Sequence, residues 1–365
     1  MIRIRCCRPL LLTLTLGLCV GPAGAQLRQP AERAGILIGT AVNPVYLTEP
    51  AYAATLSREF NMLEPEDALK WYAIRPDEKT LNFEAADRLV EFAASHGMKV
   101  RGHTLLWGGH DPAWLNEHTP EQLSQLLHDH IQTVVGRYRG RIFAWDVVNE
   151  AFDHEGKLKD SVWYNQPGIG LAKQGTSYME QAFRWAHAAD PAALLFYNEA
   201  GAEGMNEKSD AVYAMVKDFQ QRGVPINGIG LQMHILDLSP DVAGINDNIK
   251  RLTALGLQVH ITELDVALAV DPEGNPLRPQ DLNRQAEIYR QIATACLRHP
   301  GCTALQTWGF TDKHSWIGWF THKSKGAALP FDQQYKPKPA YHALEEALSQ
   351  AGANGSAGVP PATRR

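Results

Sequence analysis

The chain has 365 residues, of which 44% are hydrophobic and 21% are charged. This composition is ordinary for a globular protein and excludes a mostly disordered chain. Lys and Arg total 35 against 40 Asp and Glu, for a formal net charge of −5, so no basic excess exists to bind nucleic acid. The length would allow two domains, but α/β barrels of this length are often single domains.

The first 25 residues have the pattern of a secretory signal peptide. Three arginines precede a mostly apolar run over residues 10–20, and AGA at 23–25 is a typical cleavage sequence. A membrane anchor, the alternative, needs about 17–25 apolar residues and different flanks. We therefore expect cleavage before Gln26, a mature protein secreted to the periplasm or the medium, and no membrane association after cleavage.

Cleavage of this leader leaves two cysteines, Cys296 and Cys302. An even pair in an exported protein indicates one disulfide, with two free buried thiols as the alternative. Two cysteines at this spacing alone make a poor zinc site.

Eight apolar, β-branched runs alternate with helical patterns along the mature chain. The candidate strands are 36–42, 60–66, 99–106, 142–150, 194–199, 228–234, 258–266 and 303–310. Such alternation predicts a parallel sheet with crossover helices, and eight repeats favour a single (β/α)8 TIM barrel over an open doubly wound sheet. We therefore expect one barrel domain over 26–350. The tail at 351–365 is small, polar and Pro-containing, so disorder is predicted there.

Polar and aromatic side chains lie at the C-terminal ends of seven predicted strands, where barrel enzymes place their catalytic groups. They are Glu66, Asp67 and Lys70 at the second strand, His103 and Trp107 at the third, Asn149 and Glu150 at the fourth, Asn198 and Glu199 at the fifth, Gln232 and His234 at the sixth, Glu263 and Asp265 at the seventh, and Trp308 and Trp316 at the eighth. Any one of them could be a solvated turn residue. Their recurrence on seven strands favours an active site on this face.

Two of these carboxylates, Glu150 and Glu263, lie in otherwise apolar strands. A buried ionised carboxylate is costly without partners, so a structural ion pair is the simple explanation for each. Two such glutamates on one barrel face also fit glycoside hydrolysis. The surrounding residue types favour sugar binding, because indoles stack on pyranose rings and polar groups bind hydroxyls.

No motif for a nucleotide, a metal or a serine nucleophile is present, so neither a cofactor nor a metal is expected. His128-Asp129-His130 has metal-ligand residue types, but it lies on a helical pattern. Residues two apart on a helix do not share a face, so we expect these histidines at the surface.

Five motifs in order resemble those of glycoside hydrolase family 10, the retaining endo-β-1,4-xylanases. They are RGHTLLW at 101–107, WDVVNEA at 145–151, GIGLQMH at 228–234, ITELDV at 261–266 and TWGFTDKHSWI at 307–317. The resemblance covers about 35–348. It implies a secreted endo-1,4-β-xylanase, monomeric, that takes xylan or xylo-oligosaccharides as its substrate.

Carried over residue by residue, the resemblance implies that Glu263 is the nucleophile and Glu150 the general acid/base. The retaining mechanism places two such carboxyl groups about 5–5.5 Å apart. Glu150 is then expected to start protonated, because the negative charge of Glu263 raises its proton affinity. Three residues would support catalysis, namely Asn149, His234 and Asp265. Residues implied to bind substrate are Glu66, Lys70, His103, Trp107, Gln232, Trp308 and Trp316. Cys296 and Cys302 match a disulfide of many members.

Four residues depart from the family pattern: Asp67, Gly108, His110 and Ala200 stand where Asn, His, Gln and Tyr are usual. Gly108 is expected to leave space, and Ala200 to remove an aromatic face for the leaving-group sugar. Two alternatives stay open, and the departures motivate the first of them. One is a related β-glycanase, or a xylanase specialised for decorated or short xylan. The other is a catalytically silent barrel that binds polysaccharide.

Overall fold

The structure, a computed structural model, describes residues 26–166, 168–169 and 175–356. The predicted signal peptide at 1–25 lies outside the described residues. Within the described ranges, no helix combines the length and the apolar character that crossing a membrane requires.

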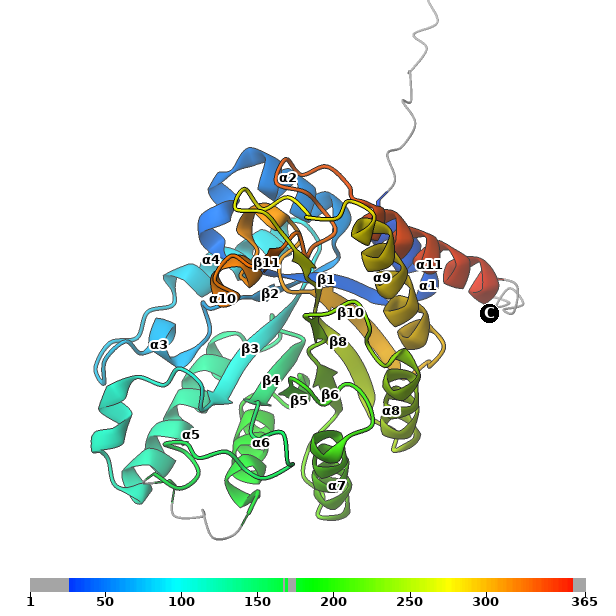
Figure 1. The fold of residues 1–365 in the computed structure, drawn as a ribbon. Coiled ribbons are helices and arrows are strands. Elements are labelled where there is room, and N and C mark those ends of the chain that lie inside the picture. Colours follow the sequence, from blue (N-terminus) through cyan, green and yellow to red (C-terminus); the bar gives the residue numbers. More distant parts are fainter. Residues whose placement is uncertain (1–25, 167, 170–174, 357–365) are drawn as a thin grey trace, which may run out of the picture.

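Parallel strands form a closed barrel at the centre of the fold (Figure 1). The barrel strands are β1 (Leu37–Val42), β2 (Met62–Pro65), β3 (Lys99–Trp107), β4 (Ala144–Asn149), β5 (Leu194–Glu199), β6 (Gly228–Leu231), β8 (Gln258–Val266) and β10 (Cys302–Thr307). Neighbours pair in this order, and β10 closes the barrel by pairing with both β8 and β1. The predicted (β/α)8 barrel is confirmed, and each predicted strand overlaps an observed one.

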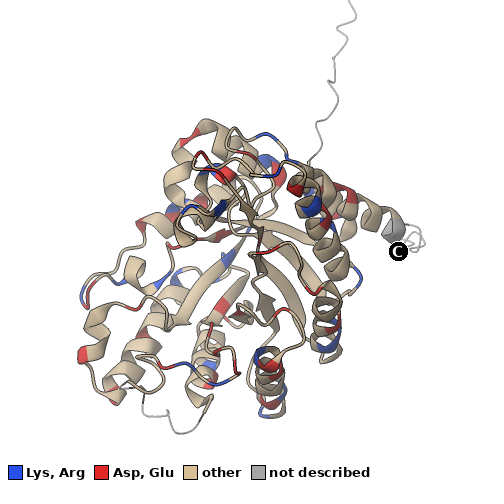
Figure 2. Ribbon diagram, viewed as in Figure 1, with Lys and Arg blue, Asp and Glu red and all other residues tan. Residues whose placement is uncertain are grey.

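Helices surround the strands (Figure 1). They are α1 (Arg28–Ala34), α2 (Pro50–Glu59), α3 (Trp71–Ile74), α4 (Glu84–Ser95), α5 (Pro120–Arg137), α6 (Ser177–Ala189), α7 (Glu207–Gln221), α8 (Val242–Ala254), α9 (Asp281–Leu297), α10 (Ile317–Phe320) and α11 (Pro339–Ser356). Shorter elements lie in the loops: β7 (His234–Ile235), β9 (Leu268–Ala269), β11 (Lys325–Gly326), and the 3-10 turns η1 (Pro44–Thr48), η2 (Ala113–Glu117) and η4 (Asp312–His314). Capping boxes start α5 at Thr119 and α7 at Asn206. Residues of both charge signs are interspersed along the outer helices and loops (Figure 2).

The last helix corrects the prediction of a disordered tail from residue 351. Helix α11 continues to Ser356. Gly352 is buried, and a Cβ placed on it would lie 3.1 Å from the Cβ of Arg33 in α1. Composition suggested disorder, but packing against the neighbouring helix stabilises the additional turn. The remainder of the predicted tail, 357–365, lies outside the described residues.

The expectation of surface histidines on α5 is wrong for His130. Its side chain is fully buried and stacks on Trp71, with ring centroids 3.8 Å apart, whereas His128 remains exposed. The two histidines therefore lie on different faces of α5, as their spacing required. The apolar face of the helix is wider than the aliphatic residues alone indicated, because it includes an imidazole.

Cys296 near the end of α9 and Cys302 at the start of β10 form a disulfide, as predicted. The sequence separation is 6 residues, so this short loop should contribute about 2 kcal/mol by restricting the unfolded chain. Replacing both cysteines by alanine should lower the free energy of unfolding by that amount in a denaturant titration. Wild-type protein in reductant, which keeps both sulfur atoms, is the control. Two titratable thiols in the non-reduced protein would refute the pairing.

Candidate active site

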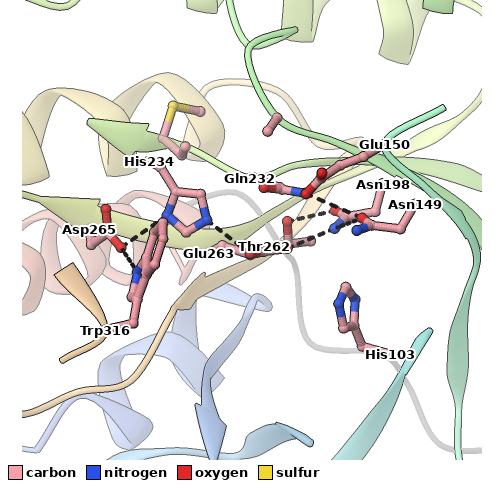
Figure 3. A network of polar contacts seen from close by, with 12 residues as sticks. His103, Asn149, Glu150, Asn198, Gln232, His234, Thr262, Glu263, Asp265 and Trp316 are labelled. Atoms are coloured by element: carbon pink, nitrogen blue, oxygen red, sulfur yellow. Dashed lines mark hydrogen bonds and ion pairs between the residues drawn. The ribbon is translucent and has the colours of Figure 1, made fainter. Parts of the chain in front are cut away.

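The predicted catalytic residues meet where the barrel strands end (Figure 3). Glu150 directly follows β4, Gln232 follows β6, and Glu263 lies within β8. Parallel strands share one C-terminal edge, so residues more than a hundred positions apart become neighbours there.

Glu263 is only 4% exposed, yet both its oxygens have partners. Oε1 accepts a hydrogen bond from Asn198 Nδ2 at 2.8 Å, and Oε2 lies 3.0 Å from His234 Nε2. The other ring nitrogen, Nδ1, lies 2.9 Å from Asp265 Oδ2, which also accepts from Trp316 Nε1 at 2.8 Å. These contacts hold the carboxylate in one orientation and offset the cost of its burial.

The ring of His234 lies between two acids, Asp265 and Glu263. Burial lowers its pKa, but the Asp265 and Glu263 carboxylates outweigh burial and hold the pKa well above its ordinary value. A protonated imidazole donates from both nitrogens. The two carboxylates thus favour the form of His234 that donates to both of them.

Glu150 lies among donors as well. Its Oε1 accepts from Gln232 Nε2 at 2.9 Å and its Oε2 from Trp107 Nε1 at 3.3 Å. Lys159 Nζ lies 3.8 Å from Oε2, with the Glu150 side chain 25% exposed. The backbone of Glu150 has a left-handed φ of 55°, which is uncommon outside glycine. A 3.0 Å hydrogen bond from its N–H to Asn198 O helps to hold this conformation.

The surroundings of Glu150 in the protein without substrate act against the protonation expected from the charge of Glu263. Burial raises its pKa, but the Gln232 hydrogen bond, the Lys159 charge and the Trp107 N–H together bring the pKa below its ordinary value. Proton donation by Glu150 therefore requires a change in these surroundings, such as the loss of water when substrate binds.

Asn198 is a functional residue that the sequence reasoning left without a role. Its Nδ2 donates to Asn149 Oδ1 at 2.9 Å as well as to Glu263, and its Oδ1 accepts from Thr262 Oγ1 at 2.8 Å. Gln232 Nε2 also lies 3.3 Å from Asn149 Oδ1. The oxygen of Asn149 is thus engaged within the protein, and its amide nitrogen can donate to a sugar hydroxyl. In the sequence, only the position of Asn198 near the end of β5 indicated a role in the active site.

Lys159 is a second active-site residue that the sequence did not indicate. A hairpin brings it back to the active site: Phe152 pairs with Leu158 in an antiparallel bridge, and Lys159 N–H donates to Ala151 O at 2.9 Å. Local sequence does not predict this approach, because the turn sets it. The start of the hairpin is anchored by Glu199, at the end of β5.

Glu199, at the end of β5, has a structural role. It is fully buried, pairs with Lys208 at 2.9 Å and accepts a hydrogen bond from Phe152 N–H at 3.2 Å. The ion-pair explanation considered for strand-end carboxylates thus applies to this residue. Its effect on the site is indirect, since it holds the start of the hairpin that carries Lys159.

The predicted substrate-binding residues after β2 lie beside two indoles. Lys70 Nζ is 5.0 Å from the ring centroid of Trp107 and 5.5 Å from that of Trp308, and it donates to Asp67 Oδ1 at 3.0 Å. Burial, helped by the Asp67 charge, raises the pKa of Glu66 to about 7. Aromatic faces beside charged hydroxyl-binding groups are suited to a sugar ring.

Three of the four departures from the family pattern have close contacts within the protein. The expected space at Gly108 does not exist, because a Cβ there would lie 2.7 Å from the Cβ of Ser161. His110 packs edge-on against Trp107, with centroids 5.1 Å apart. Asp67 is paired with Lys70 inside the protein. A histidine at 108 would therefore displace the loop after β4 rather than restore a contact.

The fourth departure, Ala200, precedes a loop that borders an open hollow of about 320 Å³. This hollow reaches His234 on one side and the half-exposed Met205 on the other. No aromatic face replaces the usual tyrosine among the described residues that line it. The loss expected from the sequence therefore remains at this position.

One group of described residues has the spacing of a cation site: Glu64, His103 and Asp146, all buried below the catalytic residues. The guanidinium of Arg101 already lies among them, hydrogen-bonded to Asp146 and 3.6 Å from Glu64. His103 Nδ1 lies 3.0 Å from Asp146 Oδ2, which fixes its ring. The group thus supports the position of His103, and its positive charge comes from arginine.

A buried and a partly exposed glutamate with separate sets of donors, flanked by amides and indoles at the open end of a barrel, define the site of a glycoside hydrolase. The chain belongs to glycosyl hydrolase family 10, whose sequence profile matches residues 26–347.

Individual relatives agree with this assignment. Endo-1,4-beta-xylanase B of Thermotoga neapolitana is 43% identical over 355 residues, which cover 94% of this chain and 97% of that protein. A beta-1,4-xylanase of Dictyoglomus thermophilum is 37% identical over 312 residues, or 83% and 86% of the two chains. The crystal structure of xylanase 10B from Thermotoga petrophila RKU-1 in complex with xylobiose is 42% identical, with a TM-score of 0.84 and coverage of 90% and 98%.

Proposed function

We propose that the protein is an endo-1,4-β-xylanase that cleaves β-1,4-xylosidic bonds within xylan and retains the anomeric configuration. The observation that carries the proposal is the pair Glu150 and Glu263, joined through the amides of Asn198, Asn149 and Gln232. The names of the relatives support xylan as the substrate.

In this mechanism, Glu263 attacks the anomeric carbon and the bond to the leaving-group oxygen breaks. Glu150 gives its proton to that oxygen, so a glycosyl-enzyme and a free sugar hydroxyl result. Glu150, now ionised, takes a proton from water, whose oxygen attacks the anomeric carbon and releases Glu263. Asn198 and His234 hold the nucleophile throughout, and Asn149 donates to the sugar.

We infer that Glu150 takes up its proton when substrate binds, because its surroundings in the protein without substrate lower its pKa. A sugar chain in the cleft displaces water from the 25% exposed side chain, and desolvation raises a carboxyl pKa. The alkaline limb of kcat, which reports the complex, should then lie at higher pH than that of kcat/KM, which reports the free protein.

The charge of Lys159 should set the position of these limbs. Its ammonium lies 3.8 Å from Glu150 Oε2 and lowers the pKa of that carboxyl. Lys159→Met should raise the pKa, so activity should persist to higher pH by about 0.2–0.7 unit, the range for a partly exposed ion pair. Lys159→Arg keeps the charge and is the control. An unchanged alkaline limb in Lys159→Met would show that Lys159 has no influence on the acid.

We further propose that the protein is exported and acts as a monomer. The leader-like pattern at 1–25 and the Cys296–Cys302 disulfide support export. The N-terminal sequence of the protein recovered from the periplasm or medium should begin at Gln26, and light scattering should give the mass of one chain.

Product analysis tests the activity directly. On soluble xylan, an endo-acting enzyme should release a ladder of xylo-oligosaccharides, and NMR should detect the β-anomer first. Faster cleavage of cellulosic or mixed-linkage glucan would favour the related β-glycanase. Binding to xylan without any new reducing ends would favour the silent barrel, and an α-anomer as first product would exclude the retaining mechanism.

A further inference from the structure

An aromatic surface without an assigned role lies on and beside the short helix α10. Trp319 is 79% exposed, the highest fraction among the large apolar side chains of the described chain, and Phe320 beside it is 49% exposed. Single exposed leucines are common, but two adjacent exposed aromatic rings indicate contact with a ligand or partner.

This surface continues the wall of the catalytic site. The ring of Phe320 lies 4.8 Å from that of Trp316, and Phe320 N–H donates to Trp316 O at 3.0 Å. Trp316 in turn donates to Asp265 and packs edge-on against His234. A chain bound in the cleft would therefore meet Trp316 first and Trp319 farther out.

Two basic residues follow the aromatic pair. His322 and Lys323 are exposed, and within the described residues neither side chain has a hydrogen-bond or ion-pair partner. Other lysines nearby are engaged: Lys313 pairs with Glu49 at 2.6 Å, and Lys325 donates to Leu236 O. An unpaired cation is notable in a chain of net charge −5, because it can attract an anionic group.

The turn holds these basic residues in a fixed arrangement. His322 and Lys323 have left-handed φ values of 51° and 61°. Their N–H groups donate to Trp319 O at 3.3 Å and to Gly318 O at 2.7 Å. Thr321 Oγ1 further accepts from Lys325 N–H at 3.1 Å. The backbone therefore places these two basic residues directly after the aromatic rings.

We propose, on the basis of the proposed function, that Trp319, Phe320, His322 and Lys323 form a secondary binding surface, the α10 rim, for xylan that carries carboxylate side groups. The exposed face of Trp319 stacks on a sugar ring of the chain outside the catalytic centre. Lys323 pairs with the carboxylate of a uronic-acid substituent, and His322 donates a hydrogen bond to it. The rim thereby favours acidic xylan over neutral xylan.

Binding measured without hydrolysis separates this surface from the activity. In a Glu263→Gln background, affinity electrophoresis would compare glucuronoxylan, neutral arabinoxylan and polygalacturonate. Trp319→Ala should weaken binding to both xylans by about three- to tenfold. Lys323→Ala should weaken binding to glucuronoxylan alone, by about two- to fivefold, and should reduce its salt dependence. Leu81→Ala, another exposed apolar residue, and Lys217→Ala, an exposed lysine on α7, are the matched controls.

Several results would contradict the α10 rim as a binding surface for acidic xylan. Unchanged binding in Trp319→Ala would overturn the rim as a site, and equal losses on both xylans in Lys323→Ala would overturn the carboxylate preference. If polygalacturonate binds as tightly as glucuronoxylan, the rim attracts any polyanion without recognising xylan. That result would also overturn the proposal. In the active protein, hydrolysis of an aryl xylobioside should be unchanged by Trp319→Ala, because so short a substrate does not reach the rim. If wild-type protein binds xylan through the rim but hydrolyses neither xylan, the proposed function fails while the rim stands.

Discussion

Replacing Glu263 by alanine is expected to lower kcat on xylan by about a thousandfold or more, the scale typical for loss of a catalytic nucleophile. The side chain is 4% exposed and held in one orientation by Asn198 and His234. A fluoro-sugar that traps the glycosyl-enzyme should add one sugar mass to the peptide that contains Glu263. The same loss is not expected for Glu121→Ala, which removes an exposed carboxylate on α5.

Two results would contradict the assignment of Glu263. Trapping of the label on another residue would identify a different nucleophile. Near-normal activity of a folded Glu263→Ala protein, with an unfolding transition like that of the wild type, would exclude a covalent role for this side chain.

Replacing Glu150 by alanine should have an effect that depends on the leaving group. Substrates with poor leaving groups need protonation, so xylan cleavage should fall about a hundredfold to ten-thousandfold, the contribution of general acid–base catalysis. Aryl xylobiosides with acidic phenols need little protonation, so they should still form the glycosyl-enzyme, seen as a burst of phenol. The second step then lacks its base, and the intermediate should accumulate.

Azide provides the discriminating control for Glu150. It is a nucleophile that needs no deprotonation, and it can occupy the space that the missing carboxylate leaves. It should accelerate turnover of aryl substrates by Glu150→Ala with a β-glycosyl azide as product, because it attacks the glycosyl-enzyme formed by Glu263. Any acceleration of Glu263→Ala should instead give the α-glycosyl azide, because azide then attacks the substrate directly. Equal loss for all leaving groups in Glu150→Ala, without rescue by azide, would contradict the acid/base role.

Active-site motifs and strand positions were accessible from the sequence because they depend on local pattern. Strand β8 reads as an apolar run interrupted by Glu263 and Asp265, and barrel geometry places such residues at one edge. The disulfide was predictable for a similar reason, because Cys296 and Cys302 are six residues apart at the end of one element and the start of the next.

The electrostatic surroundings of Glu150 could not be predicted from the sequence, because they depend on donors that arrive from distant segments. Gln232 and Lys159 reach Glu150 from the end of β6 and from the hairpin after β4, and together they reverse the expected direction of its pKa shift. A pKa depends on distances of a few ångströms, which sequence spacing does not specify.

The sequence by itself determined that this chain forms a parallel barrel and that Glu150 and Glu263 lie at its C-terminal edge. Hydrophobic periodicity and motif spacing suffice for that, since both follow from local backbone geometry. Only the tertiary structure decided that Ser161 fills the space at Gly108, that His130 is buried, and that α11 runs on past residue 350. Each of these features depends on contacts between side chains from distant segments. Close packing of the whole interior determines those contacts.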